Sequence, residues 1–282
     1  MRQHEFLQGR FWDKYSLNTV DEEIRKYFTT KFFNLTGNDF VDEEEHFGYE
    51  KKCMDLYTFF DKIIHQLTGD SGYPEGIRTN FLTTNYDFIV EKILDNCLHD
   101  TLPYYSYSYR GFKPFEVNGG KNWIIPQENQ NTYPLIKLNG GMEIFKDKEI
   151  YRIDYRKKKE NPLPEIILPC QNQLYDSEYF QTIFPKAARI LQETKVLVII
   201  GYSFSKEDSI LRFLLNQFAD SRRDAVDKYI FYIDYDRYGR ESELRERALE
   251  VFPYFRENLS VYTKGFRNFV KEFNRIKSRF DP

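Results

Sequence analysis

The chain has 282 residues, 41% hydrophobic and 30% charged, which is enough for one large domain or two small ones with a sizeable core. Its 41 Lys and Arg nearly balance 44 Asp and Glu, so the net charge of −3 excludes an overall attraction for nucleic acid. The longest aliphatic run covers only residues 196–200 and no secretory signal is visible, while three widely spaced cysteines form no metal-ligand pair. We expect a cytoplasmic protein without a membrane span or a metal.

The first 76 residues have the pattern of helices. Apolar residues recur at helical spacing within residues 20–28 and 54–67, and glycine and proline then punctuate residues 69–76. We therefore expect a helical region over residues 1–76, packed on a core that occupies residues 77–282, within a single globular unit.

From residue 78 onward, short apolar runs alternate with helical patterns. The runs predict strands at Arg78–Thr83, Pro134–Leu138, Glu165–Leu168, Lys195–Ile200, Lys228–Ile233 and Leu259–Tyr262. The patterns between them predict helices at Asp87–Cys97, Ser177–Thr194, Lys206–Phe218, Arg240–Val251 and Lys264–Arg279. Strands separated by helices favour an α/β fold with a doubly wound, mostly parallel Rossmann-like sheet and helices on both faces.

Polar residues crowd the end of the first predicted strand, Thr83-Thr84-Asn85-Tyr86-Asp87, just before a predicted helix. Ligands of such sheets bind beyond the carboxyl ends of the strands. Asp87 or Thr84 could simply cap the helix. Five polar-rich residues are more than a cap requires, so this segment is also a candidate binding site.

Three later strands also end in residues suited to a ligand. Gly201 would let the backbone approach a ligand closely, and Ser203 can hydrogen-bond a ribose or phosphate oxygen. The strand at 134–138 runs into Asn139-Gly140. Asp234 ends another strand, where such folds often bind ribose hydroxyls, although an acidic strand end is also commonly a plain turn.

Four motifs in this order resemble the sirtuin-like NAD-binding domains, especially the branch found in bacterial anti-phage defence. The resemblance covers roughly residues 55–240. Its motifs are Phe81-Leu82-Thr83-Thr84-Asn85-Tyr86-Asp87, Pro134-Leu135-Ile136-Lys137-Leu138-Asn139-Gly140, Ile166-Ile167-Leu168-Pro169 and Val198-Ile199-Ile200-Gly201-Tyr202-Ser203-Phe204-Ser205.

The resemblance implies a site for NAD, as substrate or ligand. Asn85 would face the nicotinamide ribose and the attacking water, Asp87 would hold the nicotinamide carboxamide, and Gly201 and Ser203 would line the adenosine half. Defence members of the family hydrolyse NAD to ADP-ribose and nicotinamide. The expected catalytic residues are Asn85, Asp87 and Asn139, and the expected NAD-binding residues are Thr83, Thr84, Asn85, Asp87, Gly140, Gly201, Tyr202, Ser203 and Asp234.

Asn139 stands where the family normally has histidine. A neutral amide cannot accept a proton as imidazole does, so Asn139 cannot be a general base. Two functions from different classes therefore stay open: an NAD hydrolase, or a subunit of one, and a catalytically inactive module that senses NAD or ADP-ribose or acts as a scaffold. A protein deacylase ranks third, because the four-cysteine zinc ribbon of deacylating sirtuins is missing between Gly141 and Pro164.

The family's opening strand and Gly-Ala-Gly phosphate loop have no counterpart in the sequence near Met1. Three explanations stay open: an upstream segment outside this sequence, loss of the loop in a degenerate member, or its supply by a partner. We accordingly expect either a homo-oligomer or a partner protein of a defence system, and no membrane partner. We do not expect the chain on its own to bind nucleic acid.

Overall fold

The computed structural model describes residues 24–27, 58, 79–91, 116–118, 135–148, 150–154, 163–168, 175–206, 208–219 and 224–276. Of the helical region expected over residues 1–76, only 24–27 and Thr58 are described, and these are helical. The rest of that region lies outside the described residues, so the division at residue 76 stays a prediction.

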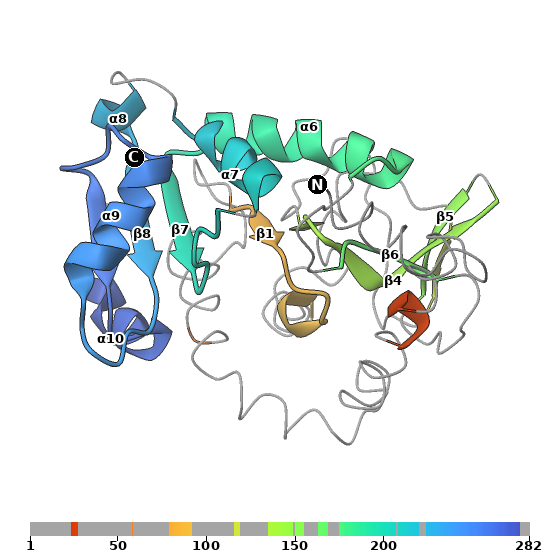
Figure 1. Ribbon diagram of the computed structural model, residues 1–282, viewed down its shortest axis with the longest axis horizontal. Helices are drawn as coiled ribbons and strands as arrows, with labels where there is room; N and C mark the ends of the chain where they lie inside the picture. Colours follow the sequence, from red (N-terminus) through yellow and green to blue (C-terminus); the bar gives the residue numbers. More distant parts are fainter. Residues whose placement is uncertain are drawn as a thin grey trace, which may run out of the picture.

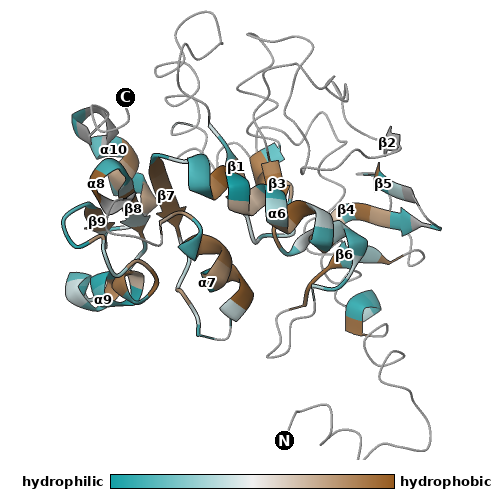
Figure 2. Cartoon of the chain, turned by 90° about the horizontal axis from the view of Figure 1, so that it is seen from above, coloured by the Kyte–Doolittle hydropathy of each residue, from teal (hydrophilic) through white to brown (hydrophobic). Residues whose placement is uncertain are grey.

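Three parallel strands form the C-terminal sheet: β7 (Val196–Ile200), β8 (Tyr229–Ile233) and β9 (Leu259–Tyr262), in that order. Their β-branched and aromatic residues suit a pleated, buried surface. Helices lie on both faces, as Figure 2 shows with α10 (Phe266–Ile276) on one side and α7 (Ser209–Asn216) and α9 (Glu241–Val251) on the other. The strands and helices expected here are confirmed, with ends that agree or differ by at most three residues; the end expected at Arg279 lies outside the described residues.

Alternate side chains of β8 anchor these two layers, because successive residues of a strand point to opposite faces. Phe231 lies 5.8 Å from the Phe269 ring of α10. Tyr232 lies 4.9 Å from Phe204, which in turn lies 6.2 Å from Phe252 at the end of α9. All five aromatic side chains are buried.

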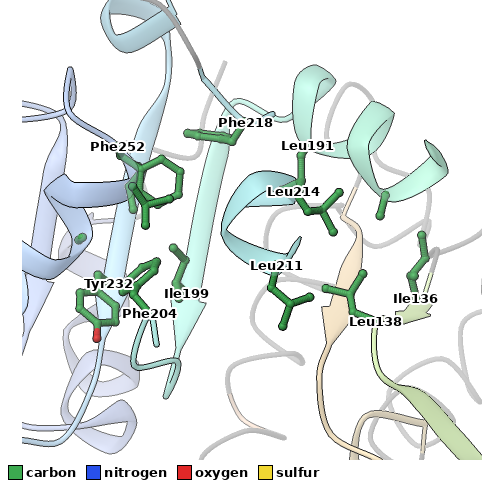
Figure 3. Packing of buried hydrophobic residues seen from close by; sticks show 14 of the residues in the cluster. Ile136, Leu138, Leu191, Ile199, Phe204, Leu211, Leu214, Phe218, Tyr232 and Phe252 are labelled. Atoms are coloured by element: carbon green, nitrogen blue, oxygen red, sulfur yellow. The ribbon is translucent and has the colours of Figure 1, made fainter. Parts of the chain in front are cut away.

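A parallel pair, β1 (Phe81–Thr83) and β3 (Leu135–Lys137), lies beside this sheet (Figure 1). The amphipathic helix α6 (Glu178–Glu193) covers it and buries Ile183, Ala187 and Leu191. One hydrophobic cluster joins the two sheets. Figure 3 shows Ile136 and Leu138 from the β3 side, Leu211 and Leu214 from α7, and Ile199 from β7.

The sequence analysis missed a β-hairpin. Strand β4 (Gly140–Asp147) pairs antiparallel with β5 (Ile150–Asp154), and also with β6 (Pro164–Ile166), while β2 (Glu116–Asn118) adds to β5 in parallel. The strand expected at Glu165–Leu168 is present as β6, but it departs from the mostly parallel arrangement, because Ile166 pairs with Gly140 across an antiparallel ladder.

The described chain is thus a mixed α/β structure with parallel sheets, several helices and one antiparallel hairpin. The short helix α8 (Asp224–Asp227) precedes β8. Among the residues that the structure describes, no helix has the length and apolar character needed to cross a membrane.

Candidate functional site at the strand ends

The ends of β1 and β3 lie side by side. The backbone N–H of Leu138 donates to the carbonyl of Thr83 at 2.7 Å, and the Asn139 side-chain amide donates to the carbonyl of Thr84 at 3.3 Å. The backbone N–H of Asn85 donates to the Thr83 hydroxyl at 3.1 Å. The Asn85 side chain is exposed. The structure therefore brings Thr83, Thr84, Asn85 and Asn139 together.

Tyr175 fixes the orientation of the Asn139 amide. Its hydroxyl donates to Asn139 Oδ1 at 3.0 Å, while Asn139 Nδ2 donates to Thr84. The Tyr175 ring packs edge-on against Phe180 and Phe184, at 5.3 and 4.9 Å. These contacts leave the amide one N–H and one oxygen lone pair for a ligand. Tyr175 was not predicted from the sequence, because it is 36 residues away from Asn139 and lies in no motif.

Asp87 acts as a cap at the start of the helical residues 89–91. Its Oδ1 accepts the backbone N–H of Ile89 at 3.1 Å, which confirms the capping interpretation. Burial raises the pKa of Asp87 above its ordinary value; the Ile89 hydrogen bond and Lys137 oppose that shift, and Glu91 adds to it. A cap uses only part of the carboxylate, so the second oxygen stays a candidate ligand contact.

The ends of β7 and β8 form the other half of the candidate site. The Gly201 N–H donates to the carbonyl of Ile233 at 2.9 Å, so Gly201 lies next to Asp234. Gly201 has φ +64°, and a Cβ there would meet no atom within 4 Å. Ser203 is exposed just beyond it. The backbone of this strand end therefore faces open space.

Asp234 is held by its own neighbours. Its Oδ1 accepts the N–H of Tyr235 at 2.8 Å, and its Oδ2 accepts the hydroxyl of Tyr232 at 3.3 Å. These bonds support the interpretation of Asp234 as a turn residue. Its role as a ribose contact stays a prediction.

One hydrophobic cluster underlies both halves of the candidate site. Tyr175, which is bonded to Asn139, and Tyr202 both pack against this cluster. The Tyr202 hydroxyl donates to Asp208 at 3.2 Å, and its pKa is raised by burial and by Asp208. The arrowheads of β1, β7 and β8 point to the same side of the molecule in Figure 1, as expected of a site at the carboxyl ends of parallel strands.

A protein-family model, the SIR2-like domain, matches residues 79–252, which is more than half of the chain. The chain belongs to the SIR2-like domain family. Every strand-end residue described above lies within the matched segment. SIR2-like domains bind NAD, so the expected NAD-related function is supported at that level. Comparison with curated proteins gives no match.

Gly140 serves the packing of this SIR2-like domain. It has φ +78°, and an added Cβ would lie 1.9 Å from the carbonyl oxygen of Glu165 on β6. Only glycine allows this close approach between β4 and β6 at such a φ. The structure thus gives Gly140 a structural role, and its predicted contact with NAD is untested.

No group of three His, Cys, Asp or Glu side chains is placed to hold a metal ion within the described part of the SIR2-like domain. The catalytic and NAD-binding roles of the strand-end residues stay predictions, since their geometry shows proximity and not chemistry.

The raised pKa of Asp87 predicts a pH-dependent effect of Asp87→Asn. A carboxyl whose pKa is higher in the folded than in the unfolded state stabilises the fold below the unfolded value, near 3.8, and this contribution is lost as pH rises through the folded value. Asparagine is neutral throughout and can still accept the Ile89 N–H. The melting temperature of Asp87→Asn should therefore rise relative to that of the parent between pH 4 and pH 8.

Asp236→Asn is the matched control with the opposite sign. Hydrogen bonds from Arg240 lower the pKa of Asp236, so its contribution is present above the unfolded value and is lost as pH falls. Asp236→Asn should be slightly less stable than the parent at pH 7 and equal to it in acid. If both variants changed the stability at pH 7 in the same direction, the opposite pKa shifts of Asp87 and Asp236 would be contradicted.

Proposed function

We propose that this SIR2-like domain hydrolyses NAD to ADP-ribose and nicotinamide, alone or as a subunit of a larger hydrolase, in the manner of the anti-phage defence branch. One observation carries the proposal: polar groups gather at the ends of two pairs of parallel strands, β1–β3 and β7–β8, whose side chains share one hydrophobic cluster. A dinucleotide needs two such groups of contacts, one for each half. A doubly wound arrangement, a cytoplasmic location and assembly with further copies or a defence partner belong to the same proposal.

The described residues fit the two halves of NAD. The adenosine half would lie against Gly201, whose backbone faces open space, with Ser203 and Asp234 beside it. The nicotinamide half would lie at the β1 end, where the exposed Asn85 adjoins the half-buried Asp87. Asp87 can accept a hydrogen bond from a carboxamide NH₂ with the oxygen that does not cap Ile89.

The reaction breaks the bond between the ribose carbon and the nicotinamide nitrogen, and a water oxygen bonds to that carbon. Oriented amide and carboxylate dipoles stabilise the positive charge that develops on the ribose. Asn85 would position the water or the ribose, and Asn139 would offer its remaining N–H to a hydroxyl. The water proton passes to solvent, since Asn139 accepts none.

One observation favours a second candidate function, a module that binds NAD or ADP-ribose without hydrolysis. Both ends of the Asn139 amide already hold protein partners, Tyr175 and Thr84. Asn139 is therefore well placed to fix a ligand hydroxyl, but as a neutral amide it cannot take a proton from an attacking water.

Calorimetric titration of NAD and ADP-ribose into the purified chain tests the proposal. The parent should bind both ligands. Asp87→Ala should raise the dissociation constant of NAD by about 10-fold or more, because one charge-assisted hydrogen bond is lost. Asp227→Ala is the control, because Asp227 is exposed in α8 at the opposite end of β8. Its affinities should match those of the parent.

Nicotinamide release then separates the two candidate functions. Release by the parent supports the hydrolase, and binding without release supports the sensing module. Release that appears only in Asn139→His would show that the site lacks nothing but the base. Failure of the parent to bind either ligand would contradict both.

A further inference from the structure

Lys137 is buried in the centre of the β1–β3 half. Its side chain has 0% exposure, although lysine is almost never fully buried unless it is paired. The sequence pattern alone placed it as an ordinary residue of a strand. Its partners in the structure suggest a more specific task.

The Lys137 ammonium on β3 joins residues 86–91 to strand β4. It lies 2.7 Å from Glu91 Oε1 and 3.1 Å from Glu143 Oε1, and both glutamate side chains also have 0% exposure. The same Nζ donates to the backbone carbonyl of Asp87 at 2.6 Å and approaches that of Tyr86 at 3.5 Å. It also lies 4.9 Å from the centre of the Phe88 ring.

Stability alone does not explain such a group. Removing two carboxylates and an ammonium from water costs as much as their attraction returns, and well-packed apolar residues often serve equally well. The arrangement does something that apolar residues cannot: a cation donates directly to main-chain carbonyls of the segment that carries the proposed nicotinamide contacts. Tyr86 is held from its other end too, because its hydroxyl donates to the carbonyl of Ile167.

We propose that Lys137 is a positioning residue that holds the Asn85–Asp87 backbone in the geometry needed to bind the nicotinamide half of NAD. The inference rests on the proposed function and deepens it. Lys137 touches no ligand itself and acts through the main chain of Tyr86 and Asp87. The described partners of its ammonium belong to residues 86–91 and to β4, and none of them comes from the β7–β8 end. The effect is therefore selective: NAD depends on Lys137, and ADP-ribose, which lacks nicotinamide, does not.

A triple variant, Lys137→Met with Glu91→Gln and Glu143→Gln, tests this selectivity. Neutralising both glutamates avoids leaving buried carboxylates beside a lost cation. After circular dichroism and a cooperative melt show that it is folded, calorimetry should give an NAD dissociation constant about 10-fold or more above that of the parent. The constant for ADP-ribose should stay within about twofold.

Two further variants make the test independent of how well methionine is tolerated. Lys137→Gln in the same Glu91→Gln and Glu143→Gln background keeps a hydrogen-bond donor among the amides but is too short to reach the main chain, and should show the same selective loss. The matched control is Lys146→Met on β4, because Lys146 pairs at the surface with the exposed Glu178 and is not buried like Lys137. It should change neither affinity.

The outcomes separate the two proposals. Parallel weakening of NAD and ADP-ribose in the Lys137 variants would show a general structural role and overturn the inference. Unchanged affinity for both would overturn it as well, while leaving the proposed function intact. A parent that binds neither ligand contradicts the proposed function itself.

Discussion

Gly140→Ala should destabilise the fold by about 2–5 kcal/mol. The new Cβ would lie 1.9 Å from the carbonyl oxygen of Glu165, a backbone atom that cannot move without disturbing the β4–β6 ladder. A φ of +78° adds the usual cost of a side chain in the left-handed region, about 1–2 kcal/mol. Urea unfolding of the parent and the variant measures the difference.

Gly201→Ala is the matched control for this effect. Its φ is +64°, but an added Cβ meets no atom within 4 Å, so only the cost of the left-handed conformation, about 1–2 kcal/mol, should remain. The methyl group enters the open space proposed for the adenosine half, so ligand affinity should fall as well. Equal losses of stability in the two variants would contradict the close approach at Gly140.

Phe252→Ala should cost about 3–5 kcal/mol, because it removes a fully buried aromatic side chain from the main core. Phe252 lies 6.2 Å from both Phe204 and Phe218 and 6.0 Å from Phe255. It therefore joins the end of α9 to the segments on either side of α7. The cavity would lie beside Phe204, the residue that follows Ser203 (Figure 3).

Phe213→Ala provides the comparison for Phe252→Ala. The same ring is removed from α7, but Phe213 is 67% exposed, so the free energy of unfolding should change by no more than about 0.5 kcal/mol. Thermal and urea unfolding both report the contrast. A similar loss in both variants would mean that burial does not govern the stability of this core.

The strands of the C-terminal sheet could be predicted from sequence because they are short, nearly continuous apolar runs. Val196–Ile200 and Tyr229–Ile233 are such runs, and their length and composition are typical of buried strands and not of helices. Strand β4 could not, because residues 140–145 are all buried and show no alternation, and two glycines open the strand. The strand near Ile166 was predicted, but its antiparallel pairing was not, because its partner β4 was not visible in the sequence.

The candidate site was predictable where it depends on topology and not where it depends on long-range side-chain contacts. Strand ends of a parallel sheet meet at one edge, so the closeness of Asn85 and Asn139 followed from the pattern. Tyr175 contacts a residue 36 positions away, and Lys137 contacts the main chain 50 positions away. No local pattern encodes such pairs.

The loop after β7 has its conformation imposed before any ligand arrives. Phe204 adopts φ +54° although it is not glycine, and its carbonyl accepts a 2.8 Å hydrogen bond from Arg212 while its ring packs against Tyr202 and Tyr232. Such a backbone persists only where its surroundings overdetermine it. The conformational entropy of this segment is therefore lost during folding, and a ligand that docks on Ser203 need not lose it again.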